Sequence, residues 1–423
     1  MTAVRIGADP IEALVDETVW ITVDGLSPNE PVTIKASLEE NNKKFSSYGC
    51  FTSTERGRVD PGTQPSLQGT YIGVDSMGLL WSMDQEPCHE MHIRFQKRDV
   101  TTPVVVNIKV FKGHITWDNL FDPHLKPMAE SQIYRRYMAK SVRRAKVRHG
   151  NIRGVLFTPP GPGPFPGVID MYGGGGGLFE HRAALLASRG FCVLALAFFL
   201  YEDLTTVYTD ITADYFIEAT KWFSGLSQVL STGIGVIGLS KGGVYGLEMS
   251  RHSSSVKAVV LINAVSFYSD VPLKFSKGDI PCTEFHFDGI VPTKNGLNFN
   301  QAQQPSDDFF IKAWESNASV FCIVGEDDHC LNPQLTYRFL KLVPKEHKHR
   351  FHVIKYPGAG HLIEPPFAPH CVASFHKHLG CMFDWGGETK AHSYAQEDSW
   401  RQIIQFFTTH LVFNDFVHEK CKL

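Results

Sequence analysis

The stretch GVIGLSKGGVYGLEMS, residues 235–250, runs from apolar residues through a glycine-rich turn into a segment typical of a helix. Ser240 stands between Gly238 and Gly242, and a turn this tight is possible because glycine has no Cβ to collide with the neighbouring backbone. The pattern G-x-S-x-G is that of a nucleophile elbow, a strained strand-to-helix turn that holds a serine hydroxyl over the edge of a sheet. Because so short a pattern also arises by chance, its interpretation depends on the partners that the rest of the chain supplies.

Strands and helices alternate on both sides of this turn, from about residue 150 onward. The run FCVLALAFF is apolar throughout, as is typical of a strand in a parallel sheet that is buried on both faces. The alternation predicts a doubly wound, mostly parallel α/β sheet with its active site at the carboxyl ends of the strands. We expect strands within 154–161, 165–177, 191–199, 233–240, 256–264 and 318–328, and helices within 178–190 and around 213–223.

The first part of the chain has a different sequence pattern, typical of β-strands alone. Short β-branched or aromatic runs, separated by Pro, Gly, Asn and Asp, predict strands at 17–26, 31–40, 68–83 and 102–113. This spacing is typical of an immunoglobulin-like β-sandwich. We therefore predict two domains, a supporting β-sandwich at 1–135 and a catalytic α/β-hydrolase domain at 136–423.

Composition limits the classes of partner. The 423 residues include 41 Lys and Arg against 44 Asp and Glu, a net charge of −3, which argues against nucleic acid or an anionic membrane as the main partner. The longest apolar run, of about a dozen residues, is too short to span a bilayer, and the N-terminus lacks the pattern of a secretory signal. The nine cysteines form no C-x-x-C pair, so we expect reduced thiols in an intracellular protein, with neither a metal site nor a disulfide framework.

A basic stretch, YRRYMAKSVRRAKVRHG at 134–150, lies at the boundary between the two predicted domains. Such a run is typical of a solvated surface. The alternative is that it attracts an anionic substrate, such as a phosphorylated cofactor.

A serine nucleophile needs a base that removes its proton and a third group that orients the base. In α/β-hydrolases these residues follow in the order Ser, Asp or Glu, His. The strand SVFCIVG ends in EDDHC, which places three acids just past its end, and FHVIKYPGAGHLIEPP ends another strand in a Gly- and Pro-rich loop that contains His361. We predict Asp328, 88 residues after Ser240, as the acid and His361, 33 residues further, as the base.

Two alternatives remain open for the acid. Asp327 is its neighbour in the same loop, and an aspartate that follows a strand often caps the next helix. We prefer Asp328 because Gly325 can form the turn and the third residue beyond it then points back toward the histidine. Among the 19 histidines, only His361 follows the acid in a glycine loop at a strand end. His329 is adjacent to the acid in the chain and cannot readily turn back to serve as its base.

An oxyanion hole requires backbone N–H groups aimed at the developing negative charge. One is the amide of Lys241, directly after the nucleophile, and we expect the others from Gly174 and Gly175 in the run YGGGGGL. The rival interpretation of this run is a phosphate-binding loop, but it lacks both the G-K-[ST] ending and the spaced G-x-G-x-x-G pattern. Together these residues predict an acyl-transfer site of the serine hydrolase type.

Longer stretches of the sequence resemble a known family. GPFPGVIDMYGGGGGLFEHRAALLASRGFCVLALAF, YEDL, IGLSKGG, VGEDDH, GHLIEPPF and WGGETKAHSYAQEDSWRQIIQFF are similar to the type I acyl-CoA thioesterase and bile acid-CoA:amino acid N-acyltransferase family. The resemblance also covers the first half, through LSPNEPVTIKASL, SMGLLWSM and KRDVTTPVVVNIKV. It implies an N-terminal β-sandwich followed by an α/β-hydrolase domain, with the nucleophile at Ser240, the acid at Asp328 and the base at His361.

The activity implied by this resemblance depends on the nucleophile. Members that conjugate bile acids to glycine or taurine have cysteine at the position of Ser240, and the thioesterases have serine. An ester on serine favours hydrolysis, whereas a thioester on cysteine stays reactive toward an amine. The resemblance therefore implies hydrolysis of acyl-CoA, with an N-acyltransferase and a non-catalytic acyl-CoA-binding protein as alternatives. No cofactor is expected beyond the coenzyme A of the substrate, and the divergent segment 270–289 allows no prediction of acyl-chain preference.

The sequence ends in Cys421, Lys422 and Leu423, a triplet that resembles the S-K-L peroxisomal address. On a polar terminus such a triplet is open to an import receptor. We therefore expect a peroxisomal protein with the peroxisomal import receptor as a partner. The alternatives are an accidental match and a cytosolic location.

Overall fold

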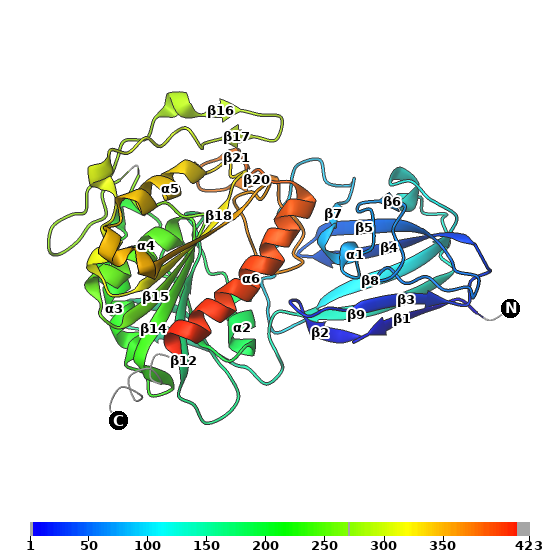
Figure 1. Ribbon diagram of the computed structural model, residues 1–423, viewed down its shortest axis with the longest axis horizontal. Coiled ribbons are helices and arrows are strands. Elements are labelled where there is room, and N and C mark those ends of the chain that lie inside the picture. The colour runs from blue at the N-terminus through cyan, green and yellow to red at the C-terminus, as the bar shows by residue number, and fades with distance from the viewer. Residues whose placement is uncertain (1–2, 270, 413–423) are drawn as a thin grey trace. The chain divides into compact units, whose positions relative to one another are not determined.

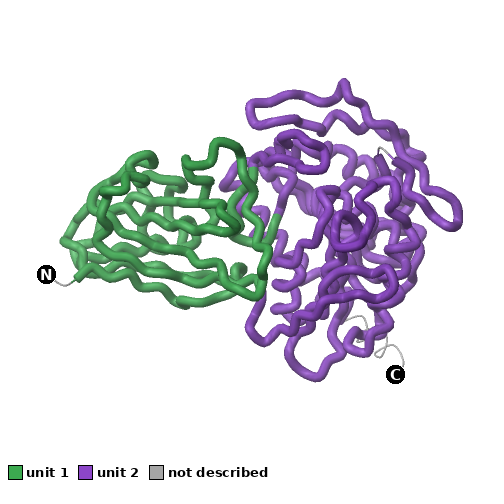
Figure 2. The backbone as a smooth tube through the Cα atoms, turned by 180° about the vertical axis from the view of Figure 1, so that it is seen from behind, with its two compact units in different colours: residues 1–137, 364–371 green, residues 138–363, 372–423 purple. Residues whose placement is uncertain are grey.

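The computed structural model describes residues 3–269 and 271–412 (Figure 1). The chain divides into two compact units, residues 1–137 with 364–371 and residues 138–363 with 372–423 (Figure 2). The predicted boundary followed residue 135. Nothing in the sequence indicated that the short segment 364–371 belongs with the first unit. The final triplet, Cys421 to Leu423, lies outside the described residues.

The first unit is built mainly of β-strands. Its larger sheet contains seven strands in the order β2-β9-β8-β4-β5-β6 with β7 paired to β5, and a two-stranded sheet pairs β1 with β3. Residues of β8 alternate between buried and less buried positions along most of the strand, so one face of the sheet is packed on a core. The strands are β1 (Arg5–Asp9), β2 (Glu12–Leu14), β3 (Trp20–Asp24), β4 (Pro31–Glu40), β5 (Lys43–Thr52), β6 (Gln68–Gly69), β7 (Asp84–Gln85), β8 (Val104–Lys112) and β9 (Ala129–Arg136).

The hairpin of β4 and β5 was not predicted. Glu40 pairs with Lys43, so the turn consists of Asn41 and Asn42 alone, both with positive φ (53° and 61°). Asparagine tolerates this conformation better than most residues, and two such residues match the twist of a two-residue hairpin turn. The strand itself, KKFSSYGCFT, lacks the regular apolar alternation that would have indicated it.

The prediction of a strand over 68–83 is wrong for most of that stretch. Only Gln68–Gly69 is a strand, and Gly78–Trp81 forms the short helix α1. The carboxylate of Asp75 accepts hydrogen bonds from the backbone N–H of Met77 (2.8 Å) and from the indole N–H of Trp81 (2.9 Å). These local bonds stabilise a turn in place of an extended strand.

Residues 364–371 complete the first unit. Glu364 forms an ion pair with Arg94, and the thiol sulfur of Cys371 lies 4.0 Å from the carbonyl oxygen of Ile93. Residues 367–369 line a small cavity of this unit. The segment therefore adds both a charged and an apolar contact to the unit.

The second unit contains an eight-stranded sheet in the order β10-β11-β13-β12-β14-β15-β18-β19. The neighbours from β13 to β19 are parallel, whereas β10 and β11 pair antiparallel. The prediction of an α/β class with a mostly parallel sheet is therefore confirmed. The strands are β10 (Arg143–His149), β11 (Ile152–Thr158), β12 (Phe165–Met171), β13 (Cys192–Ala197), β14 (Val229–Leu239), β15 (Val256–Ile262), β18 (Ser319–Gly325) and β19 (Phe351–Tyr356).

Helices cover both faces of this sheet. Gly246 of α4 packs against Val236 of β14, and the preceding strand residue, Gly235, lies against the ring of Phe407 of α6. Consecutive strand residues point to opposite faces, so α4 and α6 lie on opposite sides of β14. Within residues 3–269 and 271–412, no helix is long and apolar enough to cross a membrane. The helices are α2 (His181–Ser188), α3 (Ala213–Ser224), α4 (Lys241–His252), α5 (Pro333–Leu342) and α6 (Thr389–Leu411).

The strand order reverses next to β12. The chain passes from β12 to its neighbour β13 and then crosses to β14 on the other side of β12. Ligand sites of open α/β sheets lie at such switch points, outside the carboxyl ends of the strands. The loop after β12 carries the glycine run, and the turn after β14 carries Ser240.

A second, smaller sheet of four short strands joins distant parts of this unit. Its order is β16-β17-β21-β20, with β16 (Val291–Pro292), β17 (Leu297–Asn298), β20 (Ala373–His376) and β21 (Cys381–Asp384). Strands of two to four residues leave no periodic pattern in a sequence, so none of them was predicted.

The basic stretch at 134–150 begins at the end of β9, and its second part, 143–149, forms β10, the edge strand of the large sheet. The guanidinium of Arg144 lies 2.6 Å from the Glu180 carboxylate, and Lys146 and Arg148 both pair with Glu202, at 2.5 and 2.7 Å. These acids neutralise much of the positive charge. The pairing favours the interpretation as a solvated surface over that of an anion-attracting site.

Candidate active site

Ser240 occupies the turn between β14 and α4 in a strained backbone conformation. Its φ and ψ are 55° and −125°, a combination that costs a residue with a side chain about 1–3 kcal/mol. The backbone N–H of Ser240 donates to the carbonyl oxygen of Ile262 on β15 (2.9 Å), and its own carbonyl accepts from Gly243 (3.0 Å). The surrounding sheet and helix thus hold the turn in place.

Three glycines make this turn possible. A Cβ on Gly238 would lie 2.2 Å from backbone atoms of Gly242 and Gly243, and a Cβ on Gly243 would lie 2.5 Å from the Cβ of Ala264. Cβ atoms in proteins essentially never approach other atoms so closely. Gly238 and Gly242 belong to the G-x-S-x-G pattern, and the requirement for Gly243 extends it by one residue.

The glycine run lies against the nucleophile. A Cβ on Gly173 would lie 3.2 Å from the Cβ and 3.5 Å from the Oγ of Ser240. Within the described part of the chain, the backbone N–H groups of Gly174 and Gly175 donate no hydrogen bond. Lys241 is the first residue of α4, where N–H groups have no partner in the helix. Amides of both segments are therefore available to a bound anion.

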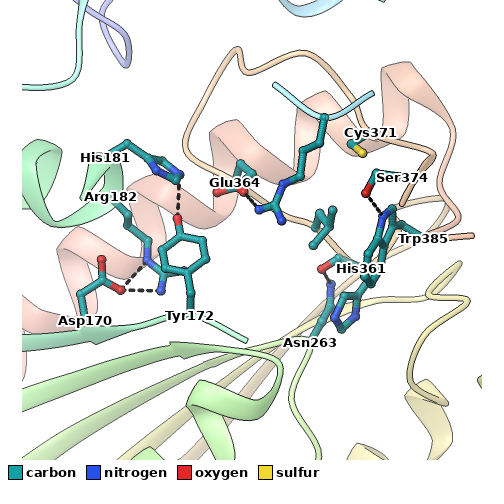
Figure 3. A network of polar contacts seen from close by, with 12 residues as sticks. Asp170, Tyr172, His181, Arg182, Asn263, His361, Glu364, Cys371, Ser374 and Trp385 are labelled. Atoms are coloured by element: carbon teal, nitrogen blue, oxygen red, sulfur yellow. Dashed lines mark hydrogen bonds and ion pairs between the residues drawn. The ribbon is translucent and has the colours of Figure 1, made fainter. Parts of the chain in front are cut away.

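A buried ion pair supports the strand that leads to this loop (Figure 3). The Arg182 guanidinium donates to the Asp170 carboxylate on β12 (2.9 Å) and lies over the ring of Tyr172 (4.3 Å to the centroid). The hydroxyl of Tyr172 is 2.8 Å from Nε2 of His181. These contacts fix the end of β12, and with it the start of the glycine run.

Asp328 and His361 form a buried pair at the same edge of the sheet. Oδ2 of Asp328, in the loop after β18, is 2.7 Å from Nδ1 of His361, in the loop after β19, and both residues are at most 3% exposed. Oδ1 of Asp328 accepts the backbone N–H groups of Cys330 (2.7 Å) and Leu331 (2.9 Å). One oxygen therefore orders its own loop, as a capping aspartate does, while the other faces the histidine.

The neighbouring acids point elsewhere. Oδ2 of Asp327 accepts the backbone N–H of Gly387 (2.9 Å), and its Oδ1 lies 3.3 Å from His329. Glu326 accepts the phenol of Tyr337 (3.0 Å). The geometry thus brings Asp328 to the histidine and leaves Asp327, the alternative acid, about half exposed.

Two opposing effects act on the pKa of His361. Burial lowers it, but the negative charge and hydrogen bonding of Asp328, together with nearby Cys330, outweigh burial and raise the pKa above the usual 6.5. The hydrogen bond of Nδ1 to Asp328 leaves Nε2 as the nitrogen that can exchange a proton with a nucleophile or substrate. Such an imidazole can act as a general base and then, once protonated, as a general acid.

Asn263, which directly follows β15, joins the loops of the acid and the base. Its side-chain amide donates to the carbonyl oxygens of Gly360 (2.9 Å) and His361 (2.8 Å), and its Oδ1 accepts the N–H of Gly325 (2.6 Å). Since Ile262, the preceding residue, binds the backbone of Ser240, consecutive residues of β15 and its end hold the nucleophile turn and the base loop.

Sequence reasoning missed two residues of this site, Asn263 and Trp385. The carbonyl of Trp385 accepts the backbone N–H of His361 (2.8 Å), and its ring stacks on the imidazole. A polar residue directly after the apolar strand VKAVVLI could have indicated Asn263. No comparable local signal marked Trp385, because its contact with His361 comes from the tertiary fold.

Two family models match the chain. The model of the acyl-CoA thioester hydrolase/BAAT N-terminal region matches residues 16–149, and that of the BAAT/acyl-CoA thioester hydrolase C terminal matches residues 211–413.

Relatives are similar over nearly the whole chain. Human acyl-coenzyme A thioesterase 1 is 37% identical over 94% of both chains, and mouse peroxisomal succinyl-coenzyme A thioesterase is 38% identical over the same shares. Mouse bile acid-CoA:amino acid N-acyltransferase is 37% identical over 96% of this chain and 98% of its own. On this evidence, the chain belongs to the acyl-CoA thioester hydrolase and bile acid-CoA:amino acid N-acyltransferase family.

Proposed function

We propose that this protein is an acyl-CoA thioesterase, which hydrolyses acyl-CoA to a carboxylic acid and free coenzyme A. The observation that carries the proposal is the buried pair of Asp328 and His361 at the edge of the sheet where Ser240 occupies its strained turn. The membership of the chain in a family of acyl-CoA enzymes supports a thioester as the substrate.

In the first step, Oγ of Ser240 attacks the thioester carbonyl while Nε2 of His361 takes the hydroxyl proton. Asp328 holds the ring through Nδ1 and stabilises the imidazolium that forms. The amides of Gly174, Gly175 and Lys241 stabilise the negative oxygen of the tetrahedral intermediate. The C–S bond then breaks, coenzyme A leaves with the proton from His361, and an acyl ester remains on Ser240.

In the second step, His361 removes a proton from water, and the hydroxide attacks the ester carbonyl. The same amides stabilise the second tetrahedral intermediate. The bond between the carbonyl carbon and Oγ breaks, His361 returns its proton to Oγ, and the carboxylic acid leaves. The reaction as written uses no cofactor beyond the coenzyme A of the substrate.

The second candidate is an amino acid N-acyltransferase, because a relative with that name is as similar as the thioesterases. It would use the amine of glycine or taurine in place of water and yield an amide. Serine at position 240 favours hydrolysis, since an ester is less reactive toward amines than a thioester.

Release of free thiol from a panel of acyl-CoAs, with and without glycine and taurine, tests the proposal. We expect amine-independent release that Ser240→Ala abolishes and that Ser254→Ala, a change of an exposed serine in the loop after α4, leaves intact. Product formation only with an amine would assign the protein to the acyltransferases. Binding of acyl-CoA without turnover would contradict both enzyme assignments.

Two finer assignments belong to this proposal. The first unit, with sheets of seven and two strands, has the β-rich composition expected of an immunoglobulin-like sandwich.

A peroxisomal location is supported by the triplet at Cys421 to Leu423 and by the name of the mouse peroxisomal relative. A fluorescent protein fused in front of the chain should co-localise with peroxisomes, and deletion of the triplet should abolish this; an unchanged cytosolic signal would contradict it.

A further inference from the structure

The indole ring of Trp385 lies flat against the imidazole of His361 (Figure 3). The ring centroids are 5.4 Å apart, and the ring planes differ by 14°. The backbone of the same residue accepts the N–H of His361. Trp385 is 7% exposed, so the stack is closed to bulk water on the indole side.

The indole itself is held in one orientation. Its N–H donates to Oγ of Ser374 on β20 (2.9 Å). The ring of Phe383 on β21 packs beside the indole, with 4.8 Å between the ring centroids. Ser374 pairs with Phe383 in the antiparallel ladder of β20 and β21, so the hydroxyl and the phenyl ring come from one rigid hairpin. A buried tryptophan whose N–H is satisfied in this way has little freedom to rotate.

The hydrogen bond to Asp328 and the stack with Trp385 constrain the imidazole in different ways. The bond at Nδ1 fixes one corner of the ring, but rotation about that bond could still tilt Nε2 away from the nucleophile. A flat neighbour restricts this tilt. No other aromatic ring among the described residues stacks face to face with His361.

The stack also matters when His361 gains a proton. The face of an indole ring carries negative quadrupole charge and attracts a cation that lies over it. The titratable groups that face the imidazole are Asp328 and Cys330, from the loop after β18, and His376 of β20 lies beyond the indole (6.4 Å between centroids). Trp385 therefore adds to Asp328 in favouring the imidazolium over the neutral ring.

We infer that Trp385 is a positioning residue, which aims Nε2 of His361 at the nucleophile and stabilises the imidazolium that forms in each step. The inference rests on the proposed use of His361 as the base. It does not depend on which ester or thioester is the natural substrate.

The test measures the activated serine with a fluorophosphonate as well as with acyl-CoA. Ser240 Oγ attacks the phosphorus atom, the P–F bond breaks and fluoride leaves, while His361 takes the serine proton. Trp385→Leu preserves apolar bulk but removes the ring, Trp385→Phe keeps a flat ring, and Ser374→Ala removes only the hydrogen bond to the indole. Trp222→Leu is the matched control, because Trp222 of α3 stacks on His149 with the same 5.4 Å between ring centroids, and both residues lie outside the loops that carry Ser240, Asp328 and His361.

We expect Trp385→Leu to slow labelling by roughly 10- to 100-fold and to lower kcat with little change in KM. It should also move the acidic limb of the pH–rate profile to lower pH by about half a unit, the shift that loss of a cation–π contact predicts. Trp385→Phe should keep most of the wild-type rate, and its acidic limb should lie close to that of the wild type. Ser374→Ala should show a smaller loss than Trp385→Leu, and Trp222→Leu should label like the wild type.

An unchanged pH limb in Trp385→Leu would overturn the inference, and so would an equal loss in Trp222→Leu. If Trp385→Leu does not fold, Ser374→Ala decides, because a positioning role requires the loss of the hydrogen bond to the indole to slow labelling in a folded protein. Labelling of folded Ser374→Ala at the wild-type rate would then overturn the inference. A wild-type protein that releases no thiol but labels in a Trp385-dependent manner would refute the proposed thioesterase function and leave this inference standing.

Discussion

A Cβ on Gly242 would lie 2.6 Å from the carbonyl oxygen of Tyr172, so the nucleophile turn and the end of β12 are in contact backbone to backbone. Neither partner can yield easily, because the obstacle is a main-chain carbonyl rather than a flexible side chain. The nucleophile turn can therefore approach the end of β12, where the glycine run begins, only with glycine at position 242.

Gly242→Ala should destabilise the second unit by roughly 2–3 kcal/mol and lower thiol release by about tenfold or more, because the added methyl group forces the two segments apart. Calorimetry and the thiol assay measure the two effects. Gly225→Ala is the control: it adds a Cβ at ordinary contact distance (3.4 Å) and at a negative φ of −87°. Full activity in Gly242→Ala would show that the close approach is not needed.

Asp328→Asn should lower kcat by about three to four powers of ten, because the amide cannot stabilise the imidazolium or fix the ring nitrogen that holds the proton. Its fold should persist, since the remaining oxygen can still accept the N–H groups of Cys330 and Leu331. The matched variant Asp327→Asn should lose less than tenfold. The reverse order of effects would make Asp327 the acid.

Rate and stability should respond to pH in opposite directions. The pKa of His361 in the folded protein is raised above 6.5, so the folded chain binds a proton that the unfolded chain releases, and stability falls as pH rises through the folded pKa. Hydrolysis needs the neutral base and should rise over the same range. Thermal unfolding of the wild type and of His361→Gln, compared from pH 6 to pH 10, isolates this contribution, which should be present in the wild type alone. Parallel curves for the two proteins would contradict the raised pKa.

Asn263→Ala should lower the free energy of unfolding by roughly 3–5 kcal/mol, because it removes three buried hydrogen bonds to backbone groups and puts alanine at a positive φ of 42°. Activity should fall as well, since the loops of Asp328 and His361 lose their common anchor. Urea unfolding and the thiol assay measure both. Asn317→Ala, at an exposed position, should be neutral, and equal effects in the two variants would contradict the anchoring role.

Much of the catalytic unit could be predicted because its strands are long and apolar. FCVLALAFF and VKAVVLINA are recognisable without any contact information, and their order along the chain places the loops that follow them at one edge of the sheet. Ser240, Asp328 and His361 stand in three such loops, and the structure brings the latter two together. The assignment of their roles remains a prediction for the experiments above.

The parts that escaped prediction depend on contacts between distant residues. The hairpin of β20 and β21 carries Ser374 to Trp385, and a stack of two rings 24 positions apart has no periodic trace in the sequence. Asp75 illustrates the opposite failure, since its local hydrogen bonds override the strand propensity of its neighbours.

The membership of residues 364–371 in the first unit has a consequence for protein synthesis. A ribosome makes residues 1–137 first and must add all of 138–363 before the segment that completes them emerges. Until then Glu364 is not present to pair with Arg94, and the small cavity lacks the wall that residues 367–369 provide. The nascent N-terminal unit therefore exposes apolar surface during synthesis. It can reach its final packing only after the ribosome has translated His361 and the segment that follows it.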